Sequence, residues 1–175
     1  MEHLPMWVEY IRTPDLSIAL MGEWESKLER IAHHTSEEDV TNLAGVPSWM
    51  MILLQRIVEI KGASNILEVW PNLELFLHGG VSFTPYREQY KKMIPSDQMH
   101  YLEIYNASEG FFGIQDQRNS EEMLLMLDYG IFYEFIPAHF ADMENPPVLW
   151  LDQVEEGVNY AMVITTNGGL WRYKI

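Results

Sequence analysis

Residues 105–110 bring together three residue types that could bind a nucleotide. Tyr105 offers a flat ring on which a purine can stack, an interaction worth about 1–3 kcal/mol per base. Ser108 offers a hydroxyl donor for a phosphate oxygen, and Glu109 offers the hard carboxylate oxygen that Mg²⁺ prefers. Gly110 lets the backbone turn or approach a ligand closely. The same residues also suit a strand that ends in a polar turn, with Ser108 capping the next segment.

A second candidate, His78-Gly79-Gly80, follows an apolar run at residues 73–77. The two glycines permit the backbone to approach a planar ligand, and His78 could bind a substrate. A tight turn, with His78 hydrogen-bonded in the core, explains the same residues without a ligand. The pair His33-His34 does not suggest a metal site, because adjacent residues point apart on a helix.

The basic residues Arg172 and Lys174 alternate in a predicted strand near the end of the sequence. Alternation places them on one face, where they could meet a phosphate or ribose or simply form a solvated face. The acid pairs at 121–122 and 155–156 lie in turn-like contexts and indicate surface charge. The chain carries no P-loop lysine motif, no Gly-x-Ser-x-Gly elbow and no dinucleotide fingerprint.

The composition excludes several functions. The net charge of −15 argues against nucleic acids and anionic membranes as partners. The absence of cysteine excludes disulfides, thiolate catalysis and Cys-based zinc sites. The longest apolar run, at 49–54, is too short to span a bilayer, and no signal peptide precedes it. We therefore expect a cytoplasmic protein, and the oligomeric state stays open.

The first third of the chain is expected to be helical. Asp15 is a plausible N-cap for one amphipathic helix, and Ser36 suits a short capped turn of helix. Pro47 suits the first position of a third helix, which Gly62 would end. The apolar stripe of the first helix is Leu20, Trp24, Leu28 and Ile31, and that of the third is Met50, Leu53, Leu54, Ile57 and Val58.

The remainder is expected to be rich in strands. A helix opened by Thr84-Pro85 and stopped by Pro95 separates the first two strands, and a hairpin turns at residues 167–169. Two further strands are joined near residues 128–130, and residues 142–147 form a surface loop. The predicted strands are 73–77, 99–104, 123–127, 131–136, 160–165 and 170–174.

This order predicts an α/β fold with a mixed β-sheet and flanking helices. We expect a single domain over residues 1–175, mainly helical over 1–64 and α/β over 65–175. In open α/β sheets, ligands bind beyond the carboxyl ends of strands. Both glycine-containing candidates, at 78–80 and 105–110, lie just beyond such ends.

With these residues in view, the chain resembles the acyl acid amido synthetase family, which includes plant auxin-responsive proteins and bacterial members. That family belongs to the adenylate-forming superfamily of firefly luciferase and the acyl-CoA synthetases. The resemblance covers about residues 49–175, with a weaker signal in the helical first third, and rests on five landmarks in the family's order. The landmarks are Val69-Trp70-Pro71-Asn72-Leu73, His78-Gly79-Gly80-Val81, Tyr105-Asn106-Ala107-Ser108-Glu109-Gly110, Tyr133-Glu134-Phe135-Ile136-Pro137 and residues 163–175.

The resemblance implies part of the large N-terminal domain of an adenylate-forming enzyme that uses ATP and Mg²⁺. A carboxylic acid would attack the α-phosphate of ATP, and the amine of an amino acid would then take the acyl group and release AMP. By match to the family's second motif, Tyr105 would stack on adenine. Ser108 would contact phosphate and Glu109 would bind Mg²⁺, which makes these two the predicted catalytic residues.

Other positions match family motifs that bind the nucleotide or the acid. Gly79 and Gly80 match the loop that passes the adenine or the acyl group, and His78 is the predicted substrate-binding residue. Tyr173 and Lys174, with Ile175, match the opening of the third motif and are predicted to bind the cofactor.

The sequence departs from the family pattern in three ways. The Gly-Asp that normally continues the third motif is missing, as are the Ser/Thr-rich phosphate loop and the mobile C-terminal domain. The expectation is a middle slice of a much longer protein, inactive alone. Two alternatives stay open: a ligase with a thiol acceptor such as coenzyme A, and a non-enzymatic acidic module that binds a small acid or a partner protein.

Overall fold

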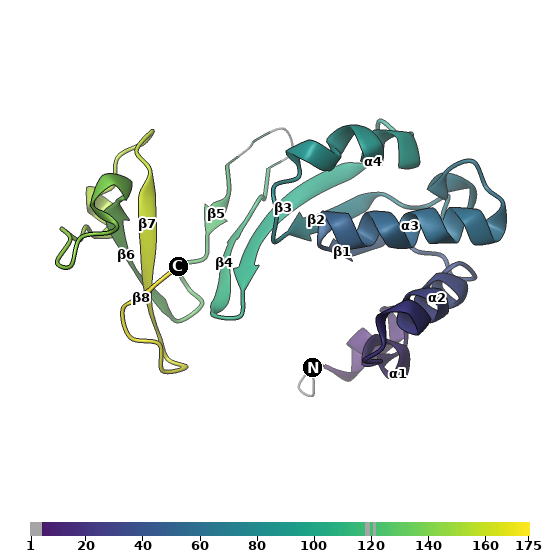
Figure 1. Cartoon of the computed structure of the whole chain (residues 1–175), viewed down its shortest axis with the longest axis horizontal. Coiled ribbons are helices and arrows are strands. Elements are labelled where there is room, and N and C mark those ends of the chain that lie inside the picture. Colours follow the sequence, from purple (N-terminus) through teal and green to yellow (C-terminus); the bar gives the residue numbers. More distant parts are fainter. Residues whose placement is uncertain (1–4, 118–119, 121) are drawn as a thin grey trace. The chain divides into compact units, whose positions relative to one another are not determined.

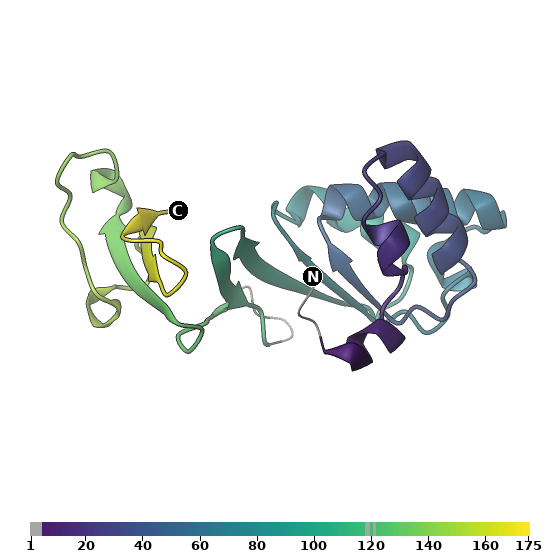
Figure 2. The same ribbon diagram turned by 90° about the horizontal axis from the view of Figure 1, so that it is seen from below.

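The computed structural model describes residues 5–117, 120 and 122–175, and the chain forms two compact units. Unit 1 is Met1–Tyr105 with Gln115–Met123, and unit 2 is Asn106–Ile114 with Leu124–Ile175. Figures 1 and 2 show the elements of both units, which are described separately. The sequence suggests one domain, and the assignment of both units to one large adenylation domain stays a prediction.

The helices of unit 1 confirm the third predicted helix but not the first two. Its helices are η1 (Met6–Tyr10), α1 (Leu16–Ala19), α2 (Trp24–Thr35), α3 (Pro47–Lys61), η2 (Ile66–Glu68), η3 (Thr84–Tyr86) and α4 (Arg87–Met93). Helix α3 begins at Pro47 and ends at Gly62, which adopts the left-handed conformation at φ 62°. The helix expected after Thr84-Pro85 is confirmed as η3 followed by α4.

The predicted single helix after Asp15 is wrong, because the chain breaks it into α1 and α2. Asp15 precedes α1, but its side chain makes no capping hydrogen bond. Glu23 starts α2 afresh, since its carboxylate accepts hydrogen bonds from the backbone N–H groups of Glu25 and Ser26. The short helix predicted at Ser36 is also wrong: Ser36 ends α2, and its hydroxyl donates to the carbonyl of His33.

Three parallel strands form the sheet of unit 1. They are β1 (Asn42–Gly45), β2 (Leu75–Gly79) and β3 (His100–Ala107), whose last two residues belong to unit 2. In this register Leu77 lies between Ala44 on β1 and Leu102 on β3. Strands β2 and β3 confirm the predictions at 73–77 and 99–104.

The core of unit 1 joins the helices to the strands (Figure 1). Helix α2 packs on α3, and α3 packs on α4. The stripe predicted for α3 is confirmed, since Leu54 and Ile57 are fully buried and its other members pack against the core. Trp70 is also buried, and its indole N–H donates to the carbonyl of Thr35 at 2.9 Å.

Unit 2 contains only antiparallel pairings. Strand β4 (Gly110–Ile114) pairs with β5 (Leu124–Leu125), and β6 (Ile131–Pro137) pairs with β7 (Tyr160–Thr166), which pairs with β8 (Tyr173–Lys174). Two 3₁₀ helices, η4 (Ala138–Phe140) and η5 (Leu151–Gln153), follow β6 and precede β7. Its core is built around Phe112, Tyr133 and Ile164.

The β7–β8 hairpin and the loop at 142–147 are confirmed. The predicted strands 123–127 and 131–136 form, but they do not pair with each other, because β5 pairs with β4 and β6 with β7. Parallel and antiparallel pairings with flanking helices confirm the predicted mixed α/β fold. Within the described residues, no helix is both long and apolar enough to cross a membrane.

Candidate functional site

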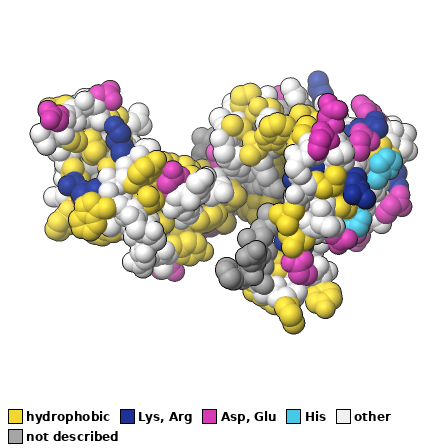
Figure 3. All heavy atoms as spheres, turned by 60° about the horizontal axis from the view of Figure 1, so that its bottom comes forward, with side chains coloured by type: hydrophobic (Ala, Val, Ile, Leu, Met, Phe, Trp, Pro, Cys, Tyr) yellow, Lys and Arg dark blue, Asp and Glu magenta, His cyan; other side chains and the backbone are white. Residues whose placement is uncertain are grey.

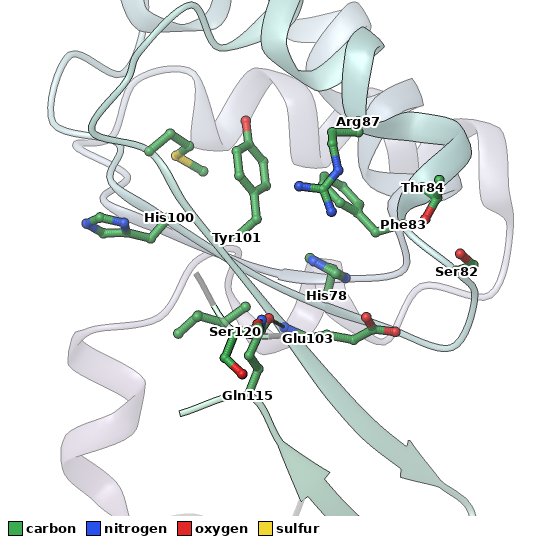
Figure 4. A pocket seen from close by; sticks show the side chains of 12 residues that line it. His78, Ser82, Phe83, Thr84, Arg87, His100, Tyr101, Glu103, Gln115 and Ser120 are labelled. Carbon is green, nitrogen blue, oxygen red and sulfur yellow. Dashed lines mark hydrogen bonds between the residues drawn. The ribbon is translucent and has the colours of Figure 1, made fainter. Parts of the chain in front are cut away.

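A pocket of about 570 Å³ lies in unit 1 (Figure 4). Strands β2 and β3, the segment that leads into α4, and two residues beyond β4 supply its lining. The lining residues are His78, Ser82, Phe83, Thr84, Arg87, Met99, His100, Tyr101, Leu102, Glu103, Gln115 and Ser120. A hollow of this volume is in the range of small-molecule sites.

Packed rings hold the aromatic side chains of this pocket in place. The rings of His78 and Phe83 stack, with centroids 4.1 Å apart and planes at 18°. Tyr101 lies 5.1 Å from Phe83, and Phe76 contacts all three rings from the core beneath. Tyr90 completes the cluster and is anchored by its hydroxyl, which donates to the carbonyl of Pro47 at 2.8 Å. The pocket is therefore lined by side chains with little rotamer freedom.

His78 is neutral at physiological pH. Its side chain is buried, with the residue only 3% exposed, and burial is the main cause that lowers its pKa from 6.5 to about 4. The positive charge of Arg87 lowers this pKa further. The Nδ1 atom of His78 is buried without a hydrogen-bond partner among the described residues.

Tyr101, which also lines the pocket, carries a second buried polar atom. Its hydroxyl has no hydrogen-bond partner within the part of the chain that the structure describes. Burial raises the pKa of Tyr101 to about 12, although the charge of Arg87 opposes the shift. The hydroxyl therefore stays protonated and can donate a hydrogen bond.

Arg87 is the cation of the pocket. Its guanidinium lies 5.7 Å from the centre of the Phe83 ring, a cation–π arrangement, and Figure 4 shows it directed between Phe83 and Tyr101. None of the ion pairs found among the described residues involves Arg87. Sequence reasoning singled out His78 but missed Arg87, Tyr101 and Glu103.

The structure gives Gly79 and Gly80 local roles. A Cβ at Gly79 would overlap the backbone oxygen of Ile104 on β3, so the close approach of two strands already requires glycine there. Gly80 adopts a φ of 82°, which favours glycine. Neither glycine is among the described residues that line the pocket. Their predicted contact with a cofactor stays a prediction.

Ser108 and Glu109 form the two-residue turn between β3 and β4. The Ser108 side chain is exposed, whereas Glu109 is partly buried. Tyr105, near the end of β3 and 40% exposed, does not belong to the described lining of the pocket. The polar turn expected from the sequence is present, and the roles proposed for these residues in nucleotide binding stay predictions.

The basic residues near the C-terminus make contacts within unit 2. The predicted strand 170–174 is shorter than expected, because Arg172 has a φ of 45° and precedes β8. Strand alternation therefore does not place Arg172 and Lys174 on one face. The Nε of Arg172 donates to Glu134 at 3.1 Å, and the Nζ of Lys174 donates to the carbonyl of Ala141 at 2.9 Å.

The described residues include no group of three or more His, Asp or Glu side chains able to hold a metal ion. His33 and His34 lie in the last turn of α2, near Glu29 and Glu38 respectively. A magnesium ion carried by a nucleotide has a lesser requirement, since it is bound by one or two carboxylates plus phosphates. Glu109, in a turn and partly exposed, fits that requirement.

A second hollow, of about 460 Å³, lies in unit 2 and is mainly apolar. Its lining comprises Leu127, Ile131, Phe132, Tyr133, Trp150, Leu151 and Asp152. Figure 3 shows hydrophobic side chains at the surface of this unit. Asp152 is the only carboxylate among the described lining residues, so this hollow offers little chemistry beyond apolar contact.

Two consecutive domain models of one family match the chain. Residues 1–99 match the GH3 family N-terminal domain, and residues 124–175 match the GH3 family central domain. The match from residue 1 corrects the expectation that the resemblance begins at residue 49. The first match lies within unit 1 and the second within unit 2.

The relatives are named as amido synthetases. Indole-3-acetic acid-amido synthetase GH3.3 of Arabidopsis thaliana is 31% identical in an alignment that covers 89% of this chain and 29% of that protein. Indole-3-acetic acid-amido synthetase GH3.4 of the same plant is 32% identical over 83% of this chain and 26% of its own length. The chain thus spans less than a third of these relatives.

The fold agrees with a solved structure of the same kind. The GH3.15 acyl acid amido synthetase superposes with a TM-score of 0.68 at 13% identity, over 92% of this chain and 38% of that one. This similarity establishes the fold alone. Together with the N-terminal domain match, which covers more than half of the sequence, it leads to one conclusion: the chain belongs to the GH3 family.

Proposed function

We propose that the gene product containing this chain is an ATP-dependent acyl acid amido synthetase. It activates a small carboxylic acid as an acyl-adenylate with release of pyrophosphate, then transfers the acyl group to the amine of an amino acid and releases AMP. One observation carries the proposal: the chain matches two consecutive domains of a family whose relatives are named amido synthetases, and residues 105–110 lie between the two matched regions.

The β3–β4 turn supplies the groups that the first step needs. Tyr105 stacks on the adenine, and the Ser108 hydroxyl donates to an oxygen of the reacting phosphate. Glu109 contributes one carboxylate oxygen to Mg²⁺, in the manner of magnesium sites that also use substrate phosphates. Bound magnesium neutralises phosphate charge during the transfer. The partly exposed position of Glu109 in a turn supports this assignment.

The other candidates have secondary roles. Gly79 and Gly80 keep the end of β2 narrow, so that the nucleotide or the acid can pass it, and His78 contributes to acid binding. Tyr173 and Lys174 approach the nucleotide once Lys174 leaves the Ala141 carbonyl. The absence of cysteine and the use of ATP support a cytoplasmic protein, and the net charge of −15 argues against nucleic-acid or anionic-membrane partners.

The test is carboxylate-dependent ATP–pyrophosphate exchange by the intact gene product. Glu109→Ala should reduce exchange by roughly a hundredfold, as expected when an electrostatic contact to the reacting phosphate is lost. Glu156→Ala removes an equal charge from an exposed loop and should leave exchange unchanged. Equal exchange by the wild type and Glu109→Ala would exclude the metal role of Glu109.

The acceptor is tested separately. Incubation with an active acid, ATP and amino acids should yield an amide, identified by mass spectrometry, and incubation with coenzyme A in place of the amino acids should yield no thioester. A thioester as the sole product would place the protein among thiol-accepting ligases. No acid-dependent exchange with a broad panel of acids would contradict the proposed function itself.

A further inference from the structure

We infer that the pocket of unit 1 is a carboxylate-binding site, with Arg87 as its anchor and the Tyr101 hydroxyl as a second donor. The inference that a carboxylate binds here stands on the pocket alone. Its assignment to one of the two acids of the reaction, the acyl acid or the amino acid, rests on the proposed function.

The pairing of charges across the chain is the first argument. Acidic residues outnumber Lys and Arg by 26 to 11, so a basic side chain easily finds a carboxylate. Arg56 pairs with two glutamates, and Glu88, adjacent to Arg87 in sequence, pairs with Lys91 at 2.9 Å instead. Arg87 is left without a carboxylate partner among the described residues, although the chain is rich in them. A guanidinium presents a fork of donors that matches a carboxylate from outside.

Two buried polar atoms in the same pocket are the second argument. Only three buried side-chain atoms in the described part of the chain lack a hydrogen-bond partner, and two of them, His78 Nδ1 and Tyr101 Oη, belong to residues that line this pocket. A buried polar group without a partner costs about 1–3 kcal/mol. A ligand that accepts from Tyr101 and bonds to His78 removes that cost.

The charge of the pocket selects the class of anion. Among the described lining residues Arg87 is the only Lys or Arg, and His78 is neutral at physiological pH. Glu103 lines the same pocket and repels a polyanion. With Arg87 and Glu103 in the pocket, a monocarboxylate leaves one negative charge in excess and a zwitterionic amino acid leaves none, whereas a triphosphate leaves several. The stacked rings of His78 and Phe83 supply an apolar wall for the body of the acid.

Glu103 also distinguishes the two possible sources of the carboxylate. An α-amino acid would place its ammonium group near Glu103 and gain from the pair, whereas a simple acid would only be repelled. Two hydrogen bonds with Gln115 hold the backbone of Glu103. The Gln115 side-chain oxygen accepts from the Glu103 N–H, and the backbone N–H of Gln115 donates to the Glu103 carbonyl. The carboxylate of Glu103 is thus carried on a fixed backbone.

The experiment is isothermal titration calorimetry on the 175-residue chain with 3-phenylpropionate, L-phenylalanine and 3-phenylpropionamide. The first two differ only in the α-amino group, and the amide lacks the negative charge. We expect at least one carboxylate to bind, and Arg87→Gln to weaken it at least tenfold, a loss of about 1.4 kcal/mol. Lys92→Gln makes the same charge change on an exposed site of α4 and should alter affinity less than twofold.

Two further variants test the second donor and the source of the carboxylate. Tyr101→Phe keeps the ring in the core and should weaken binding severalfold. Glu103→Gln should weaken L-phenylalanine if the pocket takes the amino acid, and should strengthen 3-phenylpropionate if it takes the acyl acid. Circular dichroism of each variant separates lost binding from lost folding.

The inference is overturned if the amide binds as tightly as the acids, if a folded Arg87→Gln chain binds them like the wild type, or if none of the probes binds. The exchange assay keeps this failure apart from that of the proposed function. Acid-dependent exchange by the intact gene product with unimpaired Arg87→Gln would reject the pocket and retain the synthetase. Carboxylate binding to the chain without acid-dependent exchange by the intact gene product would retain the pocket and reject the synthetase.

Discussion

The burial of His78 against Phe83 couples the stability of unit 1 to pH. The pKa of His78 is 6.5 when unfolded and about 4 when folded, so between these values the unfolded chain binds the proton more readily. Stability should therefore fall as pH drops through this window. From pH 7 to pH 5 the expected loss is about 2 kcal/mol, measured by urea unfolding at both pH values.

The control for this effect is His78→Asn, which should lose the pH dependence over the same interval. Carboxylates with lowered pKa values, such as Glu29 and Glu37, contribute stability above 4.5 and lose it only at lower pH. The expected change in stability between pH 7 and pH 5 therefore comes from His78 and not from these carboxylates. Parallel pH profiles for the wild type and His78→Asn would show that His78 is not held neutral by the fold.

The residues of the pocket show why sequence alone identified only His78 among them. His78 stands out because it precedes two glycines after an apolar run. Arg87 and Tyr101 have no motif, because the fold brings them together from α4 and β3, and no spacing rule links them. The position of Arg87 at the start of a helix is a signal that could have found it. An arginine in the first turn opposes the helix dipole and needs another reason to be there.

Strand pairing in unit 1 depends on Gly79. A Cβ at this position would overlap the carbonyl oxygen of Ile104, and backbone cannot move aside as a side chain can. Gly79→Ala should therefore destabilise the chain by about 1–3 kcal/mol, the usual cost of overpacking. Chemical denaturation followed by tryptophan fluorescence measures this loss, because Trp70 reports on the core of unit 1.

Gly22→Ala is the matched control for Gly79→Ala, since nothing lies within 4 Å of a Cβ there and its φ is not positive. It should change the free energy of unfolding by less than about 0.5 kcal/mol. If both variants unfold like the wild type, strands β2 and β3 do not approach as closely as this register requires.

Helix α2 depends on its own capping residue. The Glu23 carboxylate accepts from two backbone N–H groups at 3.0 and 2.7 Å. The Ser26 side chain, followed by these two backbone hydrogen bonds, lowers the pKa of Glu23. Glu23→Ala should lower the stability of unit 1 by about 1 kcal/mol, the typical value for an N-cap. Glu23→Gln keeps one side-chain acceptor, so its midpoint in urea unfolding should lie between those of the wild type and Glu23→Ala. A wild-type midpoint for Glu23→Ala would mean that α2 does not need this cap.

Elements with strong local signals were predicted, and elements defined by their neighbours were not. Helix α3 has a proline at its start, a glycine after its end and an apolar stripe between them, so its bounds follow from the sequence. Strand β1 is four residues with one buried side chain, Leu43, and forms only because β2 lies beside it. The apolar residues from Leu20 to Ile31 keep a helical spacing across Gly22, which predicts one continuous helix. The structure instead starts a new helix after the N-cap Glu23.

The division of the whole chain has no counterpart in its composition. The boundary cuts through β3 and falls again directly after β4, with no Pro-, Gly- or Ser-rich linker to mark it. Both family matches nevertheless respect it, since residues 1–99 fall in unit 1 and 124–175 in unit 2. Contacts between residues distant in sequence decide such a boundary, and periodicity and composition do not register them.

The charge of the whole molecule separates the two ligands by their need for metal. A chain with a net charge of −15 repels ATP unless a cation accompanies it, whereas a monocarboxylate needs only the local field of Arg87. Removing divalent metal with EDTA should therefore abolish acid-dependent pyrophosphate exchange by the intact gene product, and added Mg²⁺ should restore it. The same treatment should leave the calorimetric affinity for a carboxylate within twofold. Exchange that persists without metal would remove the reason for a carboxylate at position 109, and carboxylate binding that vanishes with EDTA would mean that a metal ion, and not Arg87, holds the acid.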